Sequence, residues 1–391
     1  MLVPISNEPR DYAWGSTTLI AQLEGRVPSG RAEAEVWFGD HPADPSETPD
    51  GRTLDEWLAD DGPASGAPAH LPYLLKLLAA ASALSIQAHP SKAQAEAGFA
   101  REEAAGIARD AGDRTYRDAN HKPELIVAVS DEFRALAGLR DLDATRRLVA
   151  AIGPGAAPLA DRLAGADASL DAVIGWVLSD GAASDIRSII AAAGAATSDE
   201  FGAELELVRT LEAGFPGDPG IVVALLMNLV TLRRGEGLFV PAGVLHAYLD
   251  GLGVELMAAS DNVLRGGLTP KHIDVAELLS VLDPTPSDVP LVRPRTLGRG
   301  IDRFDVPVPD FALDRVRLGR GEEPVVVTLG GPAIALATGG QVSVTGAASG
   351  LCVSLAPGDA VFVTPDEGTL RIAGDGELFI AVPGEVLSAH D

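Results

Sequence analysis

Residues 235–246 read Gly-Glu-Gly-Leu-Phe-Val-Pro-Ala-Gly-Val-Leu-His, and this stretch decides how the rest of the chain is interpreted. Its apolar centre lies between glycines and a Pro-Ala-Gly turn, which predicts a Gly-rich hairpin that ends at His246. A second stretch, Gly358 to Thr364, resembles the first half of this hairpin. The repeat predicts two related β-barrels, with Thr369 in the second at the position of His246. Hairpins that converged on the same turn chemistry are the alternative explanation.

Two other short segments carry polar side chains at the spacing of a strand. Gln87 and His89 are two residues apart, and Lys122 and Glu124 repeat that spacing. Side chains alternate along a strand, so each pair faces one side. Together with His246, the segments supply two imidazoles, a carboxylate and an amide oxygen, which suit a Zn²⁺ site with one position free for substrate. The alternatives are histidines satisfied by ordinary hydrogen bonds and a surface Lys–Glu ion pair.

The composition narrows the class of protein. The length of 391 residues predicts roughly two to three domains. With 30 Lys+Arg against 56 Asp+Glu, the net charge of −26 argues against nucleic acid and membrane surfaces as partners, and an anionic substrate would need a local basic pocket. The N-terminus lacks the features of a signal peptide, and the longest apolar runs are too short to cross a bilayer. The single cysteine, Cys352, fits a reducing compartment, so we expect a cytoplasmic protein.

The composition and the spacing of apolar residues change along the chain. The first part mixes strand-like runs with Gly, Pro and Asp, whereas an Ala-rich middle part has apolar residues at helical spacing. Ser91–Gln94 and Thr197–Glu200 read as capping boxes that start helices. Towards the end, short strands are separated by Gly pairs and Pro-Gly. We therefore expect a mainly β protein with a catalytic domain of residues 1–140 plus 215–285, a helical insertion of residues 141–214 and a C-terminal β domain of residues 286–391 without metal.

A cationic loop follows the segment that starts at Glu255. Arg265 and Lys271 bracket Gly-Gly-Leu-Thr-Pro, and two cations beside such a loop can bind phosphate. The plainer interpretation is a strand, a polar turn and the start of a helix.

Taken together, these segments resemble the type I mannose-6-phosphate isomerases (phosphomannose isomerases) of the cupin superfamily. The most specific motifs are Gln-Ala-His-Pro at 87–90, Asn-His-Lys-Pro-Glu at 120–124 and Ser-Asp-Asn-Val at 260–263. The hairpin at 235–246 resembles the second conserved motif of cupin barrels, in which the terminal histidine binds a metal. The resemblance implies a cupin jelly-roll β-barrel as catalytic core, an α-helical domain and a second, cupin-like β domain at the C-terminus.

The resemblance also implies roles for individual residues. Glu255 is our first candidate for the catalytic base, ahead of Asp261, Lys122 and His121. Lys76 and Ser85 match positions suggested to contact the phosphate of the substrate. The implied ligands of one Zn²⁺ per chain are Gln87, His89, Glu124 and His246; the implied catalytic residues are Arg265, Glu255, Lys122, His121 and Asp261; the implied substrate-binding residues are Lys76, Ser85, Tyr248, Lys271 and Trp14.

The implied activity is interconversion of D-mannose 6-phosphate and D-fructose 6-phosphate by proton transfer through a metal-stabilised enediolate. We expect a monomer whose only partner is the small sugar phosphate. Two other classes are possible from the sequence, a cupin metal-dependent oxygenase and a non-catalytic sugar-phosphate-binding cupin. Oxygenase sites usually gather three histidines and a glutamate, whereas Gln87 stands in the place of one histidine here. The retained lysine, arginine and carboxylates argue against a non-catalytic relic.

Overall fold

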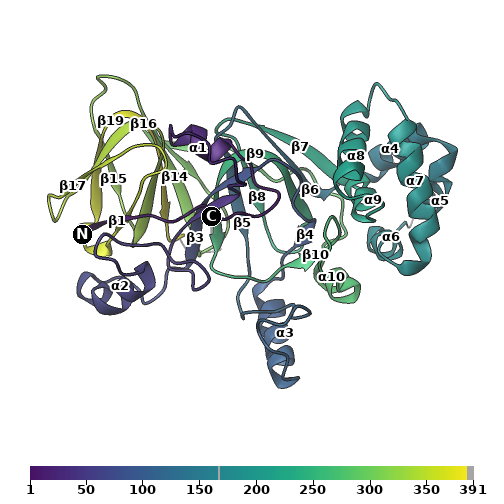
Figure 1. Ribbon diagram of the computed structural model, residues 1–391, viewed down its shortest axis with the longest axis horizontal. Coiled ribbons are helices and arrows are strands. Elements are labelled where there is room, and N and C mark those ends of the chain that lie inside the picture. Colours follow the sequence, from purple (N-terminus) through teal and green to yellow (C-terminus); the bar gives the residue numbers. More distant parts are fainter. Residues whose placement is uncertain (166–167, 385–391) are drawn as a thin grey trace, which may run out of the picture.

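The computed structural model describes residues 1–165 and 168–384. Within them the protein is mostly β-sheet with helices. Figure 1 shows a central sheet between a C-terminal sheet at one end and a group of helices at the other. None of the helices in this part of the chain has the length and the apolar composition that crossing a bilayer requires.

The central sheet is built around one long strand, β9, which pairs with four neighbours. Strands β4 and β5 pair with it directly, so that segments from distant parts of the chain meet on its surface. Strands β3 and β6 also pair with β9. The strands are β2 (Glu35–Phe38), β3 (Tyr73–Ala80), β4 (Gln87–Ala88), β5 (Glu124–Ala128), β6 (Glu132–Leu139), β7 (Met227–Arg233), β8 (Gly237–Val240), β9 (His246–Ala258), β10 (Leu264–Arg265) and β11 (Leu291–Val292).

The C-terminal sheet is antiparallel and contains one strand from the opposite end of the sequence. Its order is β1-β18-β16-β19-β14-β13-β12, with β15 on β19 and β17 on β16. The strands are β1 (Leu2–Ile5), β12 (Arg295–Gly298), β13 (Ile301–Phe304), β14 (Ala312–Leu318), β15 (Val325–Thr328), β16 (Ala333–Gly346), β17 (Cys352–Leu355), β18 (Ala360–Val363) and β19 (Thr369–Val382). In the described residues neither sheet closes on itself by hydrogen bonding, so the pairing does not show the predicted barrels as closed.

The repeat seen in the sequence has a structural counterpart. The apolar centre of the hairpin is the buried strand β8, and the matching residues form the buried strand β18. β8 is followed by a turn and β18 by a short 3-10 helix (Pro365–Glu367), and a long strand of the same sheet comes next in both cases. His246 is the first residue of β9, and Thr369 is the first residue of β19. The two positions that the sequence aligned therefore have the same place in the two sheets.

Two strands cross the predicted domain boundaries. β1 pairs with β18 in the C-terminal sheet, although residues 1–140 were expected to belong to the catalytic domain. β11 pairs with β8 in the central sheet, although it follows the predicted boundary at residue 286. The last seven residues of the predicted C-terminal domain, 385–391, lie outside the described part of the chain.

The Ala-rich middle part forms the group of helices. Its helices are α4 (Leu142–Ile152), α5 (Ala157–Leu163), α6 (Leu170–Val177), α7 (Ala183–Ala195), α8 (Gly202–Gly214) and α9 (Gly220–Leu225). The remaining α-helices of the described chain are α1 (Leu19–Leu23), α2 (Leu54–Asp60), α3 (Lys92–Ala104) and α10 (Val275–Val281). Ser91 caps α3 through the predicted capping box with Gln94. The box predicted at Thr197 is wrong: α8 starts at Gly202, and Ser198 Oγ accepts a hydrogen bond from the Phe201 N–H.

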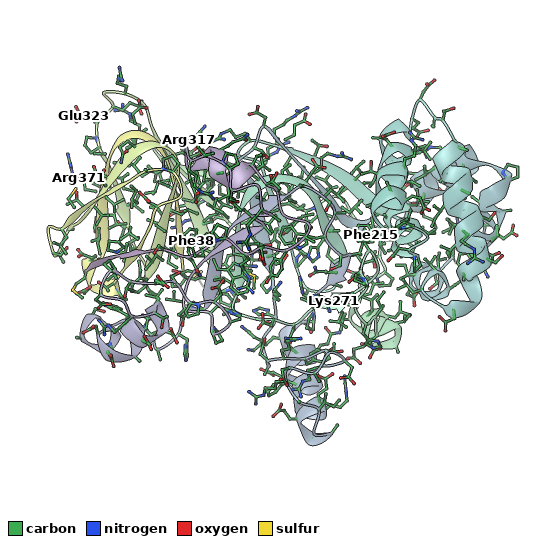
Figure 2. All side chains as sticks on the ribbon, viewed as in Figure 1. Phe38, Phe215, Lys271, Arg317, Glu323 and Arg371 are labelled. Atoms are coloured by element: carbon green, nitrogen blue, oxygen red, sulfur yellow. The ribbon has the colours of Figure 1, made fainter. Side chains whose placement is uncertain are left out.

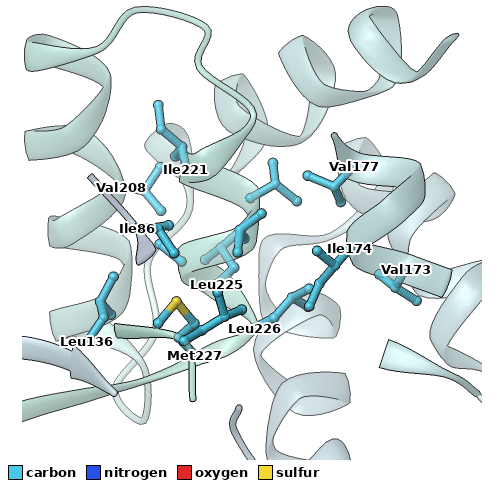
Figure 3. Close-up of a cluster of buried hydrophobic side chains, with 14 of the residues drawn as sticks. Ile86, Leu136, Val173, Ile174, Val177, Val208, Ile221, Leu225, Leu226 and Met227 are labelled. Atoms are coloured by element: carbon cyan, nitrogen blue, oxygen red, sulfur yellow. The ribbon is translucent and has the colours of Figure 1, made fainter. Parts of the chain in front are cut away.

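The helices are anchored to the central sheet by one continuous core. Every residue of α9 is buried, and the core that surrounds it includes Val173 and Ile174 of α6 and Leu136 of β6. Figure 3 shows Leu225, Leu226 and Met227 among these side chains. Ile86, directly before β4, belongs to the same cluster. Fully burying a side chain of this size stabilises a fold by about 1.5–3 kcal/mol, so the packing fixes the strand that carries Gln87.

We expect Cys352 to be irrelevant to catalysis. It is an exposed free thiol in β17, on the C-terminal sheet. Cys352→Ser should keep turnover near that of the unmodified chain and leave the zinc content at one ion per chain. Steady-state kinetics and metal analysis check both expectations. A second stoichiometric metal mapped to residues 286–391, or a large loss of turnover, would contradict them.

Candidate metal and substrate site

Three side chains from distant segments meet beside β9. His246 starts β9, Glu124 starts β5, and His89 follows β4 directly. β4 is held in register by the pairing of Gln87 with His246. His89, Glu124 and His246 are all buried, and one potential ligand atom of each lies within 4.8 Å of the others. The pairing of short strands with one long strand thus gathers the predicted ligands.

Both imidazoles direct a nitrogen at the same carboxylate. His89 Nε2 lies 3.1 Å from Glu124 Oε1, and His246 Nε2 lies 3.2 Å from Glu124 Oε2. The main-chain carbonyl of Asn262 lies 2.8 Å from His89 Nδ1 and can only accept, so the proton is assigned to Nδ1 and the lone pair to Nε2. His89 Nε2 is buried and has no hydrogen-bond partner among the described residues. A buried, unpartnered lone pair beside a carboxylate fits a bound cation.

The electrostatics of this group also suit a cation. Burial, followed by the charge of Lys122, lowers the pKa of His89 to about 4, so the imidazole is neutral at pH 7. Burial acts to raise the pKa of Glu124, but Lys122 and the two histidines hold it well below the usual range. Lys122 Nζ lies 2.5 Å from Glu124 Oε1. A neutral imidazole and an ionised carboxylate are the forms that bind a metal ion.

The amide of Gln87 is oriented by its neighbour. Gln87 Nε2 donates to Ser85 Oγ at 3.0 Å, which fixes the nitrogen side of the amide. The amide oxygen is thereby left as the free ligand atom. Gln87 lines a cavity of about 70 Å³ together with Glu35, Lys76, Leu78, Leu84, Ser85, Lys122, Glu124, His246, Ala247, Tyr248 and Glu255. Most of the residues predicted for the site therefore face one space.

A group of buried ion pairs lines part of this cavity. Lys76 of β3 and Glu255 of β9 are register partners, and Lys76 Nζ lies 3.1 Å from Glu255 Oε2 and 3.4 Å from Glu35 Oε1. Burial acts to lower the pKa of Lys76, but the surrounding carboxylates outweigh it and raise the pKa. Burial also raises the pKa of Glu255, which Lys76 partly offsets. Glu255 is thus a carboxylate whose environment favours proton uptake.

Glu35 was not identified from the sequence. It lies in β2, two residues before Trp37, and its side chain contacts both Lys76 and the indole Nε1 of Trp37, 2.8 Å away. Lys76 Nζ also lies 4.9 Å from the Trp37 ring centroid. The only available signal was the alternation of a charged residue and an aromatic residue along a short strand, which many surface strands share.

Several of the predicted residues lie outside the cavity. His121 Nε2 contacts Asp310 Oδ2 of the C-terminal region at 2.8 Å. Asp261 Oδ1 lies 3.4 Å from His41 Nε2 and lines a separate cavity of about 330 Å³. Trp14 is half-buried and stacks on Tyr12, with ring centroids 5.7 Å apart. Arg265 pairs across the sheet with Gln87, so its backbone lies next to a predicted ligand.

Arg265 belongs to a group of cations with Lys271 and Arg117. Burial and the charge of Arg117 lower the pKa of Arg265. Burial and the charges of Arg265 and Arg117 lower the pKa of Lys271, which lies near α10 at the lower edge of the central sheet (Figure 2). Among the described residues none of the three forms an ion pair with a carboxylate. In a chain of net charge −26, three neighbouring unpaired cations make a local site for an anion. Arg117 was not singled out in the sequence, because it follows no cationic pattern of its own.

Comparisons with known proteins define the class to which this fold and site belong. A family model described as phosphomannose isomerase type I, catalytic domain, matches residues 2–142. The mannose-6-phosphate isomerase of Salmonella typhimurium is 35% identical, over 95% of this chain and 97% of the relative. The Escherichia coli enzyme of the same name is 33% identical over the same shares. A crystal structure of the Salmonella typhimurium enzyme bound to its substrate, fructose 6-phosphate, and to zinc superposes with a TM-score of 0.87 at 30% identity, covering 98% of this chain and 100% of that one.

The chain belongs to the mannose-6-phosphate isomerase family, whose members are isomerases.

Proposed function

We propose that this protein is a zinc-dependent aldose–ketose isomerase that interconverts D-mannose 6-phosphate and D-fructose 6-phosphate. The observation that carries the proposal is one cavity lined by Glu124 and His246 of the His89–Glu124–His246 group and by the Lys76–Glu255 pair. A cation ligand set and a proton-accepting carboxylate are the two elements that an isomerisation next to a carbonyl requires. The similarity to a solved enzyme bound to fructose 6-phosphate and zinc supports this assignment.

We assign one Zn²⁺ per chain to the Nε2 atoms of His89 and His246, the Glu124 carboxylate and the amide oxygen of Gln87. When bound, the ion supplies Lewis acidity that withdraws charge from the carbonyl and hydroxyl oxygens of the sugar. Lys122 stays within reach of the same oxygens, because its ammonium already lies beside Glu124. Tyr248 donates to Glu124 Oε2 at 3.3 Å and holds the carboxylate from the other side.

The proton moves between C2 and C1 of the sugar, and we propose Glu255 as the group that carries it. Its pKa is raised by burial, which makes the carboxylate a better acceptor than an exposed glutamate. Lys76 holds Glu255 in place and offsets its charge when the proton leaves. Asp261 and His121 remain second candidates for proton transfer during ring opening, although they lie outside the cavity.

The phosphate of the substrate requires positive charge without a competing carboxylate. Lys76, proposed for this contact, is engaged with Glu35 and Glu255. We therefore assign the phosphate contact to Lys271 and Arg117; Arg265, whose backbone pairs with that of Gln87, lies near both cations. Ser85, whose hydroxyl accepts from Gln87, remains a proposed contact next to the metal ligands.

We also propose that the catalytic unit is a cupin jelly roll of residues 1–140 plus 215–285, with a helical insertion of residues 141–214 and a cupin-like C-terminal unit of residues 286–391. The repeated order of β8–β9 and β18–β19 supports the relationship between the two β units. β1 comes from the first unit but pairs in the C-terminal sheet, and β11 comes from the last unit but pairs in the central sheet. The two units therefore share strands across the proposed boundaries.

Metal removal tests the proposed function. Chelator-treated protein should lose nearly all turnover of mannose 6-phosphate to fructose 6-phosphate, followed by NMR of the sugar mixture. One equivalent of Zn²⁺ should restore the rate, whereas Mg²⁺ should not, because nitrogen ligands favour zinc. Full activity in protein shown to be free of transition metals would overturn the proposal. Dioxygen consumption with iron bound would instead favour the oxygenase alternative, and tight sugar-phosphate binding without turnover would favour the non-catalytic one.

A further inference from the structure

Asn262 connects two parts of the site that lie far apart in the sequence. Its main-chain carbonyl accepts a hydrogen bond from His89 Nδ1 at 2.8 Å. Its side-chain Oδ1 accepts from the main-chain N–H of Arg117 at 2.8 Å and of Asp118 at 3.3 Å. Asn262 is completely buried, so its polar groups depend on these partners.

The other half of the same amide is also used. Asn262 Nδ2 donates to the main-chain carbonyls of Asp118 and Asn120, each at 2.8 Å. It also lies 3.2 Å from Asp118 Oδ1. Through these contacts the segment 117–120 wraps around the side chain of Asn262. This segment runs directly into Lys122 and Glu124, so the amide sets where the ligand strand begins.

We propose that Asn262 is a positioning residue that holds His89, the Lys122–Glu124 strand and Arg117 in one geometry. The inference rests on the proposed function, because it assigns the residue to the zinc and phosphate ends of that site. His89 and Glu124 supply two of the assigned ligands, and Arg117 belongs to the cation group. One buried residue therefore links the proposed zinc ligand His89, through its main-chain carbonyl, to the segment of Arg117 and Lys122, through its side-chain amide.

The chemistry of the position selects asparagine. Only a carboxamide offers two donors and an acceptor oxygen with two lone pairs in this volume. An aspartate would keep the acceptor side towards Arg117 but lose both donors, and it would place a second charge next to Asp118. An alanine would remove the partner of the partly buried N–H groups of Arg117 and Asp118 and of the Asp118 carbonyl. The surrounding contacts of Ser260 Oγ with Asp118 Oδ1, 2.9 Å, and of the Asp261 N–H with Asp118 Oδ2, 2.8 Å, reinforce the same segment.

The test compares two asparagines that make similar contacts. Asn228 Nδ2 also donates to three main-chain carbonyls, those of Ala137, Leu139 and Ser287. None of these is a proposed site residue, although Ala137 is the register partner of His246. Asn262→Ala, Asn262→Asp and Asn228→Ala are purified as full chains. Zinc affinity is measured by competition with a chromophoric chelator, and thermal unfolding is recorded with and without zinc. KM and kcat for mannose 6-phosphate are measured at saturating zinc.

Asn262→Ala keeps the main-chain carbonyl that accepts from His89 Nδ1 but removes the side-chain amide that holds this carbonyl and the 117–120 segment in place. Losing such a supporting contact behind the metal ligands typically weakens binding by about 10- to 100-fold, and we expect this loss for Asn262→Ala. KM should rise in the same variant, because the main-chain N–H of Arg117 loses its hydrogen-bond acceptor. Asn262→Asp keeps the acceptor contacts and the shape but places a carboxylate oxygen against the carbonyls of Asp118 and Asn120, so its loss of zinc affinity should be at least as large. Whichever of the two Asn262 variants folds carries the test. Asn228→Ala should lose stability but keep zinc affinity within about twofold.

Equal zinc affinity in the Asn262 and Asn228 variants would overturn the proposal, as would a loss of stability without any change in affinity or KM. Zinc affinity is measured without turnover, so this outcome is independent of whether the chain isomerises mannose 6-phosphate. If zinc affinity depends on Asn262 as expected but the chain does not convert mannose 6-phosphate, only the proposed function is contradicted.

Discussion

His246→Ala is expected to lose most of its zinc and to lower kcat by roughly 100- to 5,000-fold. The reason is that the variant removes one of two imidazoles directed at the Glu124 carboxylate and leaves the remaining ligands too few to hold the ion tightly. Losing the Lewis acid removes about 3–5 kcal/mol of stabilisation from the charge that develops on the sugar oxygens. Metal analysis and steady-state kinetics measure the two effects.

The matched control is His70→Ala. His70 is a histidine outside the ligand group, with 81% of its side chain exposed and Asp40 as its partner. It should keep zinc and turnover. Helical circular dichroism should be unchanged in both variants because neither histidine lies in α4–α9. A His246→Ala protein that retained both the metal and the rate would show that the ligand set is assigned wrongly.

Arg265→Ala is expected to lower kcat/KM by about 30- to 1,000-fold, which corresponds to about 2–4 kcal/mol of lost transition-state stabilisation. The loss should fall mainly on kcat, because the Arg265 backbone pairs with that of the ligand Gln87. Stability should change by no more than roughly 1 kcal/mol, since burial and the nearby Arg117 charge already disfavour the charged guanidinium. Steady-state assays over a range of substrate concentrations separate kcat from KM.

Two other substitutions provide comparisons for the effect of Arg265→Ala. Lys271→Ala should mainly raise KM, because we assign Lys271 to the phosphate rather than to the reacting oxygens. Arg209→Ala removes an arginine of α8 that pairs with Glu206 and should leave both constants unchanged. If Arg265→Ala has normal kcat and KM, the active site does not extend to the cationic loop.

The sequence was informative about the candidate ligands because their spacing follows from strand geometry. Gln87 and His89, like Lys122 and Glu124, had to share a face, and His246 ended a hairpin with distinctive turn residues. The assembly of these residues on β9 could not be derived from local patterns. It depends on pairings between residues such as Gln87 and His246, which no short-range rule specifies.

The residues that the sequence missed share a physical reason. Glu35 contacts Lys76 across the β2–β3 pairing, and Arg117 joins Arg265 through the folded loop, so both are functional candidates only by tertiary neighbourhood. The prediction of a capping box at Thr197 failed for a local reason rather than a tertiary one. Helix α8 begins at Gly202 without a side-chain cap, and Ser198 instead forms a local contact with the N–H of Phe201 just before the helix.

The pairing of β1 with β18 also constrains how the chain folds during synthesis. Leu2 is the register partner of Val363, so β1 cannot pair with β18 until the long stretch of chain between them has been synthesised. Closing a loop of this length is slow compared with forming local helices such as α4–α8, and β1 must wait as an unpaired strand. Pro4 in the middle of β1 removes one main-chain donor and makes the waiting strand a poorer template for intermolecular pairing.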